Sequence, residues 1–145
     1  MKRVITLLLV CLLALTGCSP NPTPEATSDE VIEIKEKMFI AQTNDIYVNA
    51  SDYLGKTIKY EGIFASQTSS EQTYYMVIRF GPGCCGDDGN VGFEVTWDKH
   101  YPNPNDWVEA VGVLEEYEEN GYNYLRLALI SLTGLSERGA ELVTQ

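Results

Sequence analysis

Apolar and polar residues alternate along most of this sequence, and this alternation limits the fold more than any other feature. A strand with one buried face repeats every two residues, whereas an amphipathic helix repeats every three or four. Ile58, Tyr60 and Phe64 share one face of such a pattern, as do Phe93 and Val95. The pattern predicts five strands, at residues 57–67, 73–80, 91–97, 107–116 and 122–132.

Turn-forming residues separate these segments and set their connections. Gly62 lies inside the first segment and predicts a bulge or bend there. Asn120 and Gly121 separate the last two segments, and this pair favours the type I′ turn of a β-hairpin. Five strands with a strongly bent first strand predict an all-β fold, a five-stranded OB-type antiparallel barrel. A small sandwich is the alternative.

The remaining parts of the domain give weaker patterns. Residues 38–40 predict a short strand, and residues 31–34 predict either a helical turn or a short strand. Residues 49–55 predict a turn or a short helical turn that ends at Gly55. Residues 135–143 allow at most one further short helix. The barrel domain is therefore expected to span residues 30–145.

The N-terminal residues have the form of a lipoprotein signal peptide. Lys2 and Arg3 precede an apolar run over residues 4–15, which is shorter than the roughly 20 residues of a spanning helix. Leu15, Thr16 and Gly17 then complete a lipobox with Cys18. We expect residues 1–17 to be removed and Cys18 to receive a lipid, which places the protein on the extracytoplasmic face of the cell membrane. The alternative is cleavage elsewhere, with Cys18 incidental.

A polar linker and a strong acid excess follow. Residues 18–29 comprise the lipidated cysteine and a proline-rich segment without large apolar side chains, which predicts a semi-extended tether. The chain has 21 Asp and Glu residues against 10 Lys and Arg residues, a formal net charge of −11. Phosphate binding needs clustered basic residues, so this balance argues against a nucleic-acid partner.

Two adjacent cysteines are the only candidates for chemistry. If Cys11 is lost with the signal peptide and Cys18 is acylated, Cys84 and Cys85 are the two that remain. They lie within residues 81–89, where four glycines and a proline exceed what a hairpin connection needs.

Three hypotheses account for this pair. First, Cys84 and Cys85, with Asp88 or Asp87, bind a soft metal or metalloid ion, because thiolates prefer copper(I), zinc or trivalent metalloids. Second, the two thiols form a strained vicinal disulfide outside the cytoplasm. Third, one cysteine packs as a small apolar side chain and the other has no role.

Three sequence blocks resemble a bacterial family. They cover residues 53–62 (YLGKTIKYEG), residues 79–88 (RFGPGCCGDD) and residues 106–112 (DWVEAVG). In this order they resemble the C-terminal domain of the YcgQ-type permease subunits, over about residues 39–132. The resemblance implies a domain of unknown biochemical role that is associated with a membrane permease.

The chain departs from this family in two respects. Family members usually carry Cys-Cys-Ala-x-Asp-Ala, so Asp88 matches the family acid whereas Asp87 is an additional one. Full-length members carry N-terminal membrane helices, and we expect a lipid on Cys18 to take their place here.

The sequence lacks a recognisable catalytic set. It contains no G-x-S-x-G motif, and its single histidine, His100, is expected in an exposed loop. We therefore expect a non-enzymatic binding or accessory module, with the soft ion as its only candidate cofactor. The alternative is an envelope module that recognises a protein or a glycan. Its stacking surface would come from tyrosines that are otherwise ordinary strand residues: Tyr47, Tyr74, Tyr75, Tyr117, Tyr122 and Tyr124.

Overall fold

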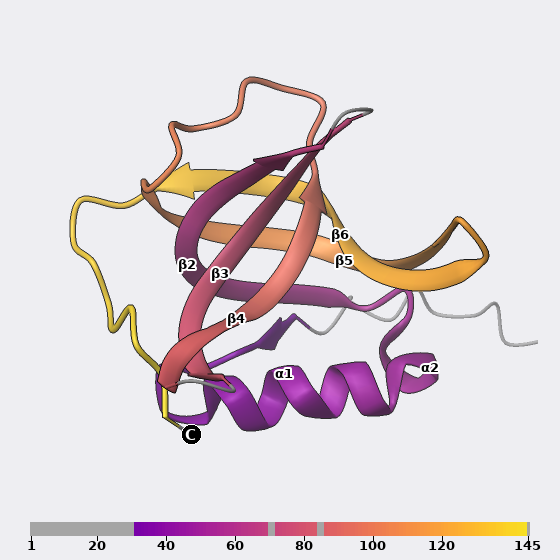
Figure 1. The fold of residues 1–145 in the computed structure, drawn as a ribbon, viewed down its shortest axis with the longest axis horizontal. Helices are drawn as coiled ribbons and strands as arrows, with labels where there is room; N and C mark the ends of the chain where they lie inside the picture. The colour runs from indigo at the N-terminus through magenta and orange to yellow at the C-terminus, as the bar shows by residue number, and fades with distance from the viewer. Residues whose placement is uncertain (1–30, 70–71, 84–85, 145) are drawn as a thin grey trace, which may run out of the picture.

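The computed structural model describes residues 31–69, 72–83 and 86–144, and these residues form a strand-rich domain with short helices (Figure 1). The strands are β1 (Ile32–Glu33), β2 (Thr57–Thr68), β3 (Thr73–Gly83), β4 (Gly86–Thr96), β5 (Trp107–Glu119) and β6 (Tyr122–Gly134). The helices are the 3-10 helix η1 (Glu36–Met38) and the α-helices α1 (Phe39–Val48) and α2 (Ala50–Tyr53). The all-β expectation is confirmed, and each of the five predicted strands has a counterpart.

The strands of the described chain form one mixed sheet in the order β1-β2-β3-β4-β6-β5, and β2 pairs with β5 as well. The sheet has six strands because residues 32–33 form β1, which confirms the short strand among the two alternatives for residues 31–34, and the antiparallel expectation is wrong because two pairs are parallel. These are β1 with β2, and β4 with β6. Strand β6 pairs with β5 along one edge and with β4 along the other.

Strand β2 changes partners along its length and curves strongly as it does so (Figure 1). Its first half pairs with β5 from Thr57 to Ile63, and its second half pairs with β3 from Ile63 to Thr68. Gly62, the residue expected to mark a bend, lies beside this change of partner. A Cβ atom at Gly62 would lie 2.7 Å from the carbonyl oxygen of Ile78, so the two strands approach too closely for a side chain.

Helix α1 contributes two large side chains to the core. Phe39 and Ile46 are buried, together with Thr43 between them, at the spacing of one helical face. The ring of Phe39 packs edge-on against the ring of Tyr60, with centroids 5.8 Å apart. The predicted strand at residues 38–40 is therefore wrong, because Phe39 begins a helix. The short helical turn expected within residues 49–55 is confirmed as α2.

The hydroxyl of Tyr60 bridges β3 and β4 inside the core. It donates a hydrogen bond to the carbonyl oxygen of Val77 at 2.8 Å and accepts one from the backbone N–H of Phe93 at 3.2 Å. Burial raises the pKa of Tyr60 well above its usual range. The adjacent Gly92 has φ +152°, and a Cβ atom there would lie 2.1 Å from the carbonyl oxygen of Val77. This crossing point therefore requires glycine.

The segment after β6 packs against the sheet without forming a helix. Phe80 donates its backbone N–H to Glu141, and Val143 donates its own to Phe80, both at 2.8 Å. The side chain of Val143 is buried in the core. The prediction of a short helix at residues 135–143 is wrong, because the backbone of this segment forms hydrogen bonds with Phe80 of β3 instead.

Candidate functional site

The hairpin of β3 and β4 carries the predicted cysteine site at its end. Gly81 pairs with Gly89, and Gly83 pairs with Gly86. The expected strand limits at residues 80 and 91 are therefore wrong, because the two strands continue through the glycine-rich segment. Cys84 and Cys85 connect Gly83 to Gly86 in the sequence and lie outside the described residues.

The two predicted acidic ligands belong to the same strand. Asp87 and Asp88 are part of β4, and their side chains also fall outside what the structure describes. The ligand set of Cys84, Cys85, Asp87 and Asp88 therefore stays a prediction. Cys18 and its lipobox likewise lie outside the described residues.

Close approach of the strands explains part of the glycine content of this hairpin. A Cβ atom at Gly89 would lie 3.0 Å from the carbonyl oxygen of Pro82 and 3.2 Å from that of Gly81. A Cβ atom at Gly81 would lie 2.9 Å from a methyl carbon of Val91. Close packing within the hairpin, against backbone at Gly89 and against the Val91 side chain at Gly81, therefore accounts for these two glycines without a ligand.

Other candidate ligands stay apart in the fold. Among the described side chains of residues 31–69, 72–83 and 89–144, no three His, Cys, Asp or Glu residues come together in a way that could hold a metal ion. His100 is exposed in the connection between β4 and β5, as expected. In the same residues, no helix is long and apolar enough to cross a membrane.

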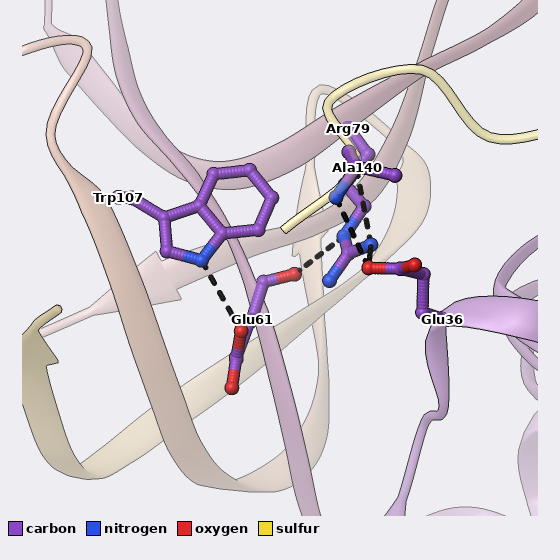
Figure 2. Close-up of polar contacts among 5 residues, drawn as sticks. All are labelled: Glu36, Glu61, Arg79, Trp107 and Ala140. Atoms are coloured by element: carbon purple, nitrogen blue, oxygen red, sulfur yellow. Dashed lines mark hydrogen bonds and ion pairs between the residues drawn. The ribbon is translucent and has the colours of Figure 1, made fainter. Parts of the chain in front are cut away.

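Arg79 forms a buried polar centre that the sequence did not reveal (Figure 2). Only 3% of this residue is exposed. Its Nε donates to the carbonyl oxygen of Glu61 at 2.8 Å, and its Nη1 donates to Glu36 Oε2 at 3.3 Å and to the carbonyl oxygen of Ala140 at 3.1 Å. The guanidinium carbon lies 4.8 Å from the ring centre of Phe39 and 4.9 Å from that of Trp107. Arg79 therefore joins β2, β3, β5, the helical segment and the C-terminal segment.

The partners of Arg79 are themselves tightly held. Trp107 Nε1 donates to Glu61 Oε2 at 3.2 Å, and Glu36 Oε2 accepts the backbone N–H of Ala140 at 3.0 Å. That backbone hydrogen bond, followed by Arg79, lowers the pKa of Glu36. A Cβ atom at Gly139 would lie 2.9 Å from Glu36 Oε2, so the C-terminal segment fits closely here. The arrangement is complete without a ligand, and we interpret it as structural.

A groove of about 460 Å³ lies on another part of the surface. Residues of β3 and β4, the end of α1, the start of α2 and the β5–β6 hairpin line it. Tyr47 stacks on Phe93 with ring centroids 5.1 Å apart, and its hydroxyl donates to the carbonyl oxygen of Gly92 at 2.9 Å. Desolvation of the hydroxyl, with a smaller effect of the Glu94 charge, raises the pKa of Tyr47 to about 12.

Comparison with known families identifies the domain. The family model of the DUF1980 C-terminal domain matches residues 19–139. The chain belongs to this family. The match confirms the resemblance to the YcgQ-type C-terminal domain, and no curated protein matches the chain.

The three resemblance blocks of this DUF1980 C-terminal domain meet at the Arg79 centre. Glu61, Arg79 and Trp107 come one from each block, and each contacts at least one of the others. The contacts of these residues link positions far apart in the chain, so no local pattern in the sequence indicates a role for them.

Proposed function

We propose that this DUF1980 C-terminal domain is a membrane-anchored, extracytoplasmic binding or accessory module, not an enzyme. We further propose that it binds a soft metal or metalloid ion at the end of the β3–β4 hairpin, in association with a neighbouring permease. The lipobox at Cys18 supports the anchor. The pairing of Gly83 with Gly86 is the observation that carries the ion site.

This pairing supports a site for one ion because it leaves only Cys84 and Cys85 to reverse the chain. Neighbouring side chains of a regular strand point to opposite faces of the sheet, so two strand cysteines could not share an ion. We propose that Cys84 and Cys85 are free of that alternation, because they connect the two paired strands and belong to neither. Asp87 and Asp88 follow directly and could add an oxygen ligand.

The number of sulfur ligands favours copper(I) or a trivalent metalloid. Zinc takes four protein ligands at structural sites, whereas two thiolates suit copper(I) and bind arsenite readily. His100 is the one histidine of the chain and lies in a different connection from the cysteines. We therefore place zinc third among the candidate ions.

We infer that the strands form an OB-type barrel that presents this hairpin end. The pairings run from β2 through β3, β4, β6 and β5 and return to β2, which is the circuit of a closed five-stranded barrel. Strand β1 lies outside this circuit and adds to β2 alone. An experimental structure in which β2 and β5 are unpaired would contradict the barrel.

Anaerobic titration tests the ion site. The reduced full-length chain, in mild detergent, is titrated with copper(I), zinc and arsenite beside the Cys84→Ser and Cys85→Ser variants. We expect copper(I) or arsenite to bind with one ion per chain and a dissociation constant in the micromolar range or below, and either substitution to abolish that binding. Absence of binding by all three ions would refute the site.

Thiol counting on protein taken directly from the cell envelope distinguishes the remaining alternatives. Two free thiols at Cys84 and Cys85 are expected if an ion occupies the site. A locked disulfide would instead favour the envelope interaction module, in which the cysteines only shape the hairpin end.

A further inference from the structure

The groove between helix α1 and the β5–β6 hairpin has the size and lining of a ligand site. Its volume of about 460 Å³ falls within the range of roughly 300–1,000 Å³ that small-ligand sites occupy. Met76 of β3 and Leu125 of β6 give it partly exposed apolar surface, over the buried side chains of Ile78 and Phe93, and Tyr124 contributes an aromatic side chain from β6. In Figure 1 the β5–β6 hairpin extends beyond the other strands, on the same side of the molecule as α2.

The charges of the groove have one sign. Glu94 and Glu116 line it, and its described lining includes no lysine, arginine or histidine. The hydroxyl of Tyr117 donates to Glu94 Oε2 at 2.6 Å and so holds this carboxylate in place. Arg126 pairs with Glu94 in the strand register, but its guanidinium is directed to Glu115 and lies over the ring of Tyr117.

The aromatic side chains of the groove also suit a cation. Tyr124 is 43% exposed and stacks on Tyr117 with ring centroids 5.6 Å apart, so the pair is positioned by the hairpin itself. The face of a tyrosine ring attracts ammonium and guanidinium groups. The methylene stem of a lysine or arginine packs on apolar surface of the kind that Met76 and Leu125 provide.

From these observations we infer that the groove binds a basic peptide segment of a protein partner. One lysine or arginine would reach Glu94 and Glu116 while an apolar neighbour covers Met76 and Leu125. Charge complementarity favours this occupant, because the chain carries a formal net charge of −11 and would repel an acidic segment. The site is separate from the cysteine hairpin end and does not depend on it.

Nuclear magnetic resonance with a defined peptide tests the inference. The full-length chain, in mild detergent, is titrated with an acetylated and amidated tripeptide that has leucine between two lysines. We expect shifts of backbone amides confined to the groove, at Asn90, Glu94 and Leu125 in particular. The matched tripeptide with two glutamates in place of the lysines should cause none. Raising the salt concentration should lower the affinity of the groove for the lysine peptide, because added ions screen exposed charges.

Charge-neutral variants identify the carboxylates responsible. Glu94→Gln combined with Glu116→Gln should lower the affinity for the lysine peptide by about tenfold, which corresponds to about 1.4 kcal/mol of binding free energy. Glutamine at residue 94 can still accept the hydrogen bond of Tyr117, so the fold should be kept. Glu118→Gln combined with Glu137→Gln changes the net charge by the same amount, at residues outside the groove. This control should keep the affinity for the lysine peptide within about twofold of the unmodified chain.

Several outcomes would overturn the inference. Equal loss of affinity in both double variants would show only a general charge effect. Equal binding of the glutamate peptide, shifts elsewhere, or no shifts at millimolar peptide would each refute the groove as a basic-peptide site. A disaccharide of N-acetylglucosamine that shifts the same amides when the lysine peptide does not would assign the groove to a glycan instead.

Discussion

The guanidinium of Arg79 donates a hydrogen bond to the carboxylate of Glu36, with 3.3 Å between Nη1 and Oε2. Arg79 lies in the middle of β3, whereas Glu36 precedes the helix that closes one end of the sheet. The same carboxylate oxygen accepts the backbone N–H of Ala140. One ion pair therefore ties together the start, the middle and the end of the described domain.

Replacing Arg79 should destabilise the fold. Arg79→Met removes a buried guanidinium together with its hydrogen bonds to Glu61, Ala140 and Glu36 and its contacts with the rings of Phe39 and Trp107. We expect the free energy of unfolding to fall by about 3 kcal/mol, measured by urea denaturation. Arg79→Lys should recover part of this loss, since lysine keeps the charge but not the planar fork.

A matched variant controls for the loss of a positive charge. Lys37 is exposed, and Lys37→Met should change the free energy of unfolding by no more than about 0.5 kcal/mol. If Arg79→Met proved as mild as Lys37→Met, the Arg79 centre would not be structural.

Acid should weaken the contact between Glu36 and Ala140. The folded pKa of Glu36 lies below its usual value of 4.5, so its stabilising contribution is complete above that value and is lost as the pH falls through the folded pKa. We expect faster hydrogen exchange at the Ala140 amide as the pH decreases from about 6 to about 3, after correction for the intrinsic rate. Glu36→Gln should remove this pH dependence, and its persistence in that variant would assign it to another group.

Alanine at residue 92 should be poorly tolerated. Its Cβ would lie 2.1 Å from the carbonyl oxygen of Val77, on a backbone with φ +152° that alanine rarely adopts. We expect Gly92→Ala to lower the free energy of unfolding by about 3 kcal/mol, measured by urea denaturation. The Cβ atom added by Gly134→Ala would meet no atom within 4 Å, so this substitution should change the free energy of unfolding by no more than about 0.5 kcal/mol. Comparable effects of the two substitutions would contradict the close approach at Gly92.

Loss of Cys18 should release the protein from the membrane. In cells that process lipoproteins, Cys18→Ser removes the thiol that would carry the lipid, so the chain should leave the membrane fraction and lose its acyl mass. Cys11→Ser alters a residue of the expected signal peptide and should leave both properties unchanged. Membrane retention of the Cys18→Ser protein would exclude Cys18 as the anchor.

The strands were predictable because their signals are local. Alternation marked each strand within a few residues of its limits, except where glycines carried β3 and β4 further than expected. Asn120 and Gly121 were correctly assigned to a hairpin turn, and their φ values of 53° and 82° are the left-handed ones that this turn requires. Parallel pairing of β4 with β6 left no such local sign.

Helix α1 and the two side-chain sites were missed for different physical reasons. The helix contains Thr43, Asn44, Tyr47 and Val48, which have weak intrinsic helix propensity, so packing of one face stabilises it. The spacing of Phe39, Thr43 and Ile46 was the available sign. The Arg79 centre and the groove depend on contacts between distant segments, which only the folded chain brings together.

The pairing of β2 with β5 has a consequence for how fast the chain folds. Thr57 faces Val113 across this pair, so a long loop must close before the first half of β2 can pair with β5. Such non-local pairing slows folding to the range of milliseconds to seconds. During that interval the apolar face of β2 is unprotected, and a chaperone that shields it would raise the yield of native protein.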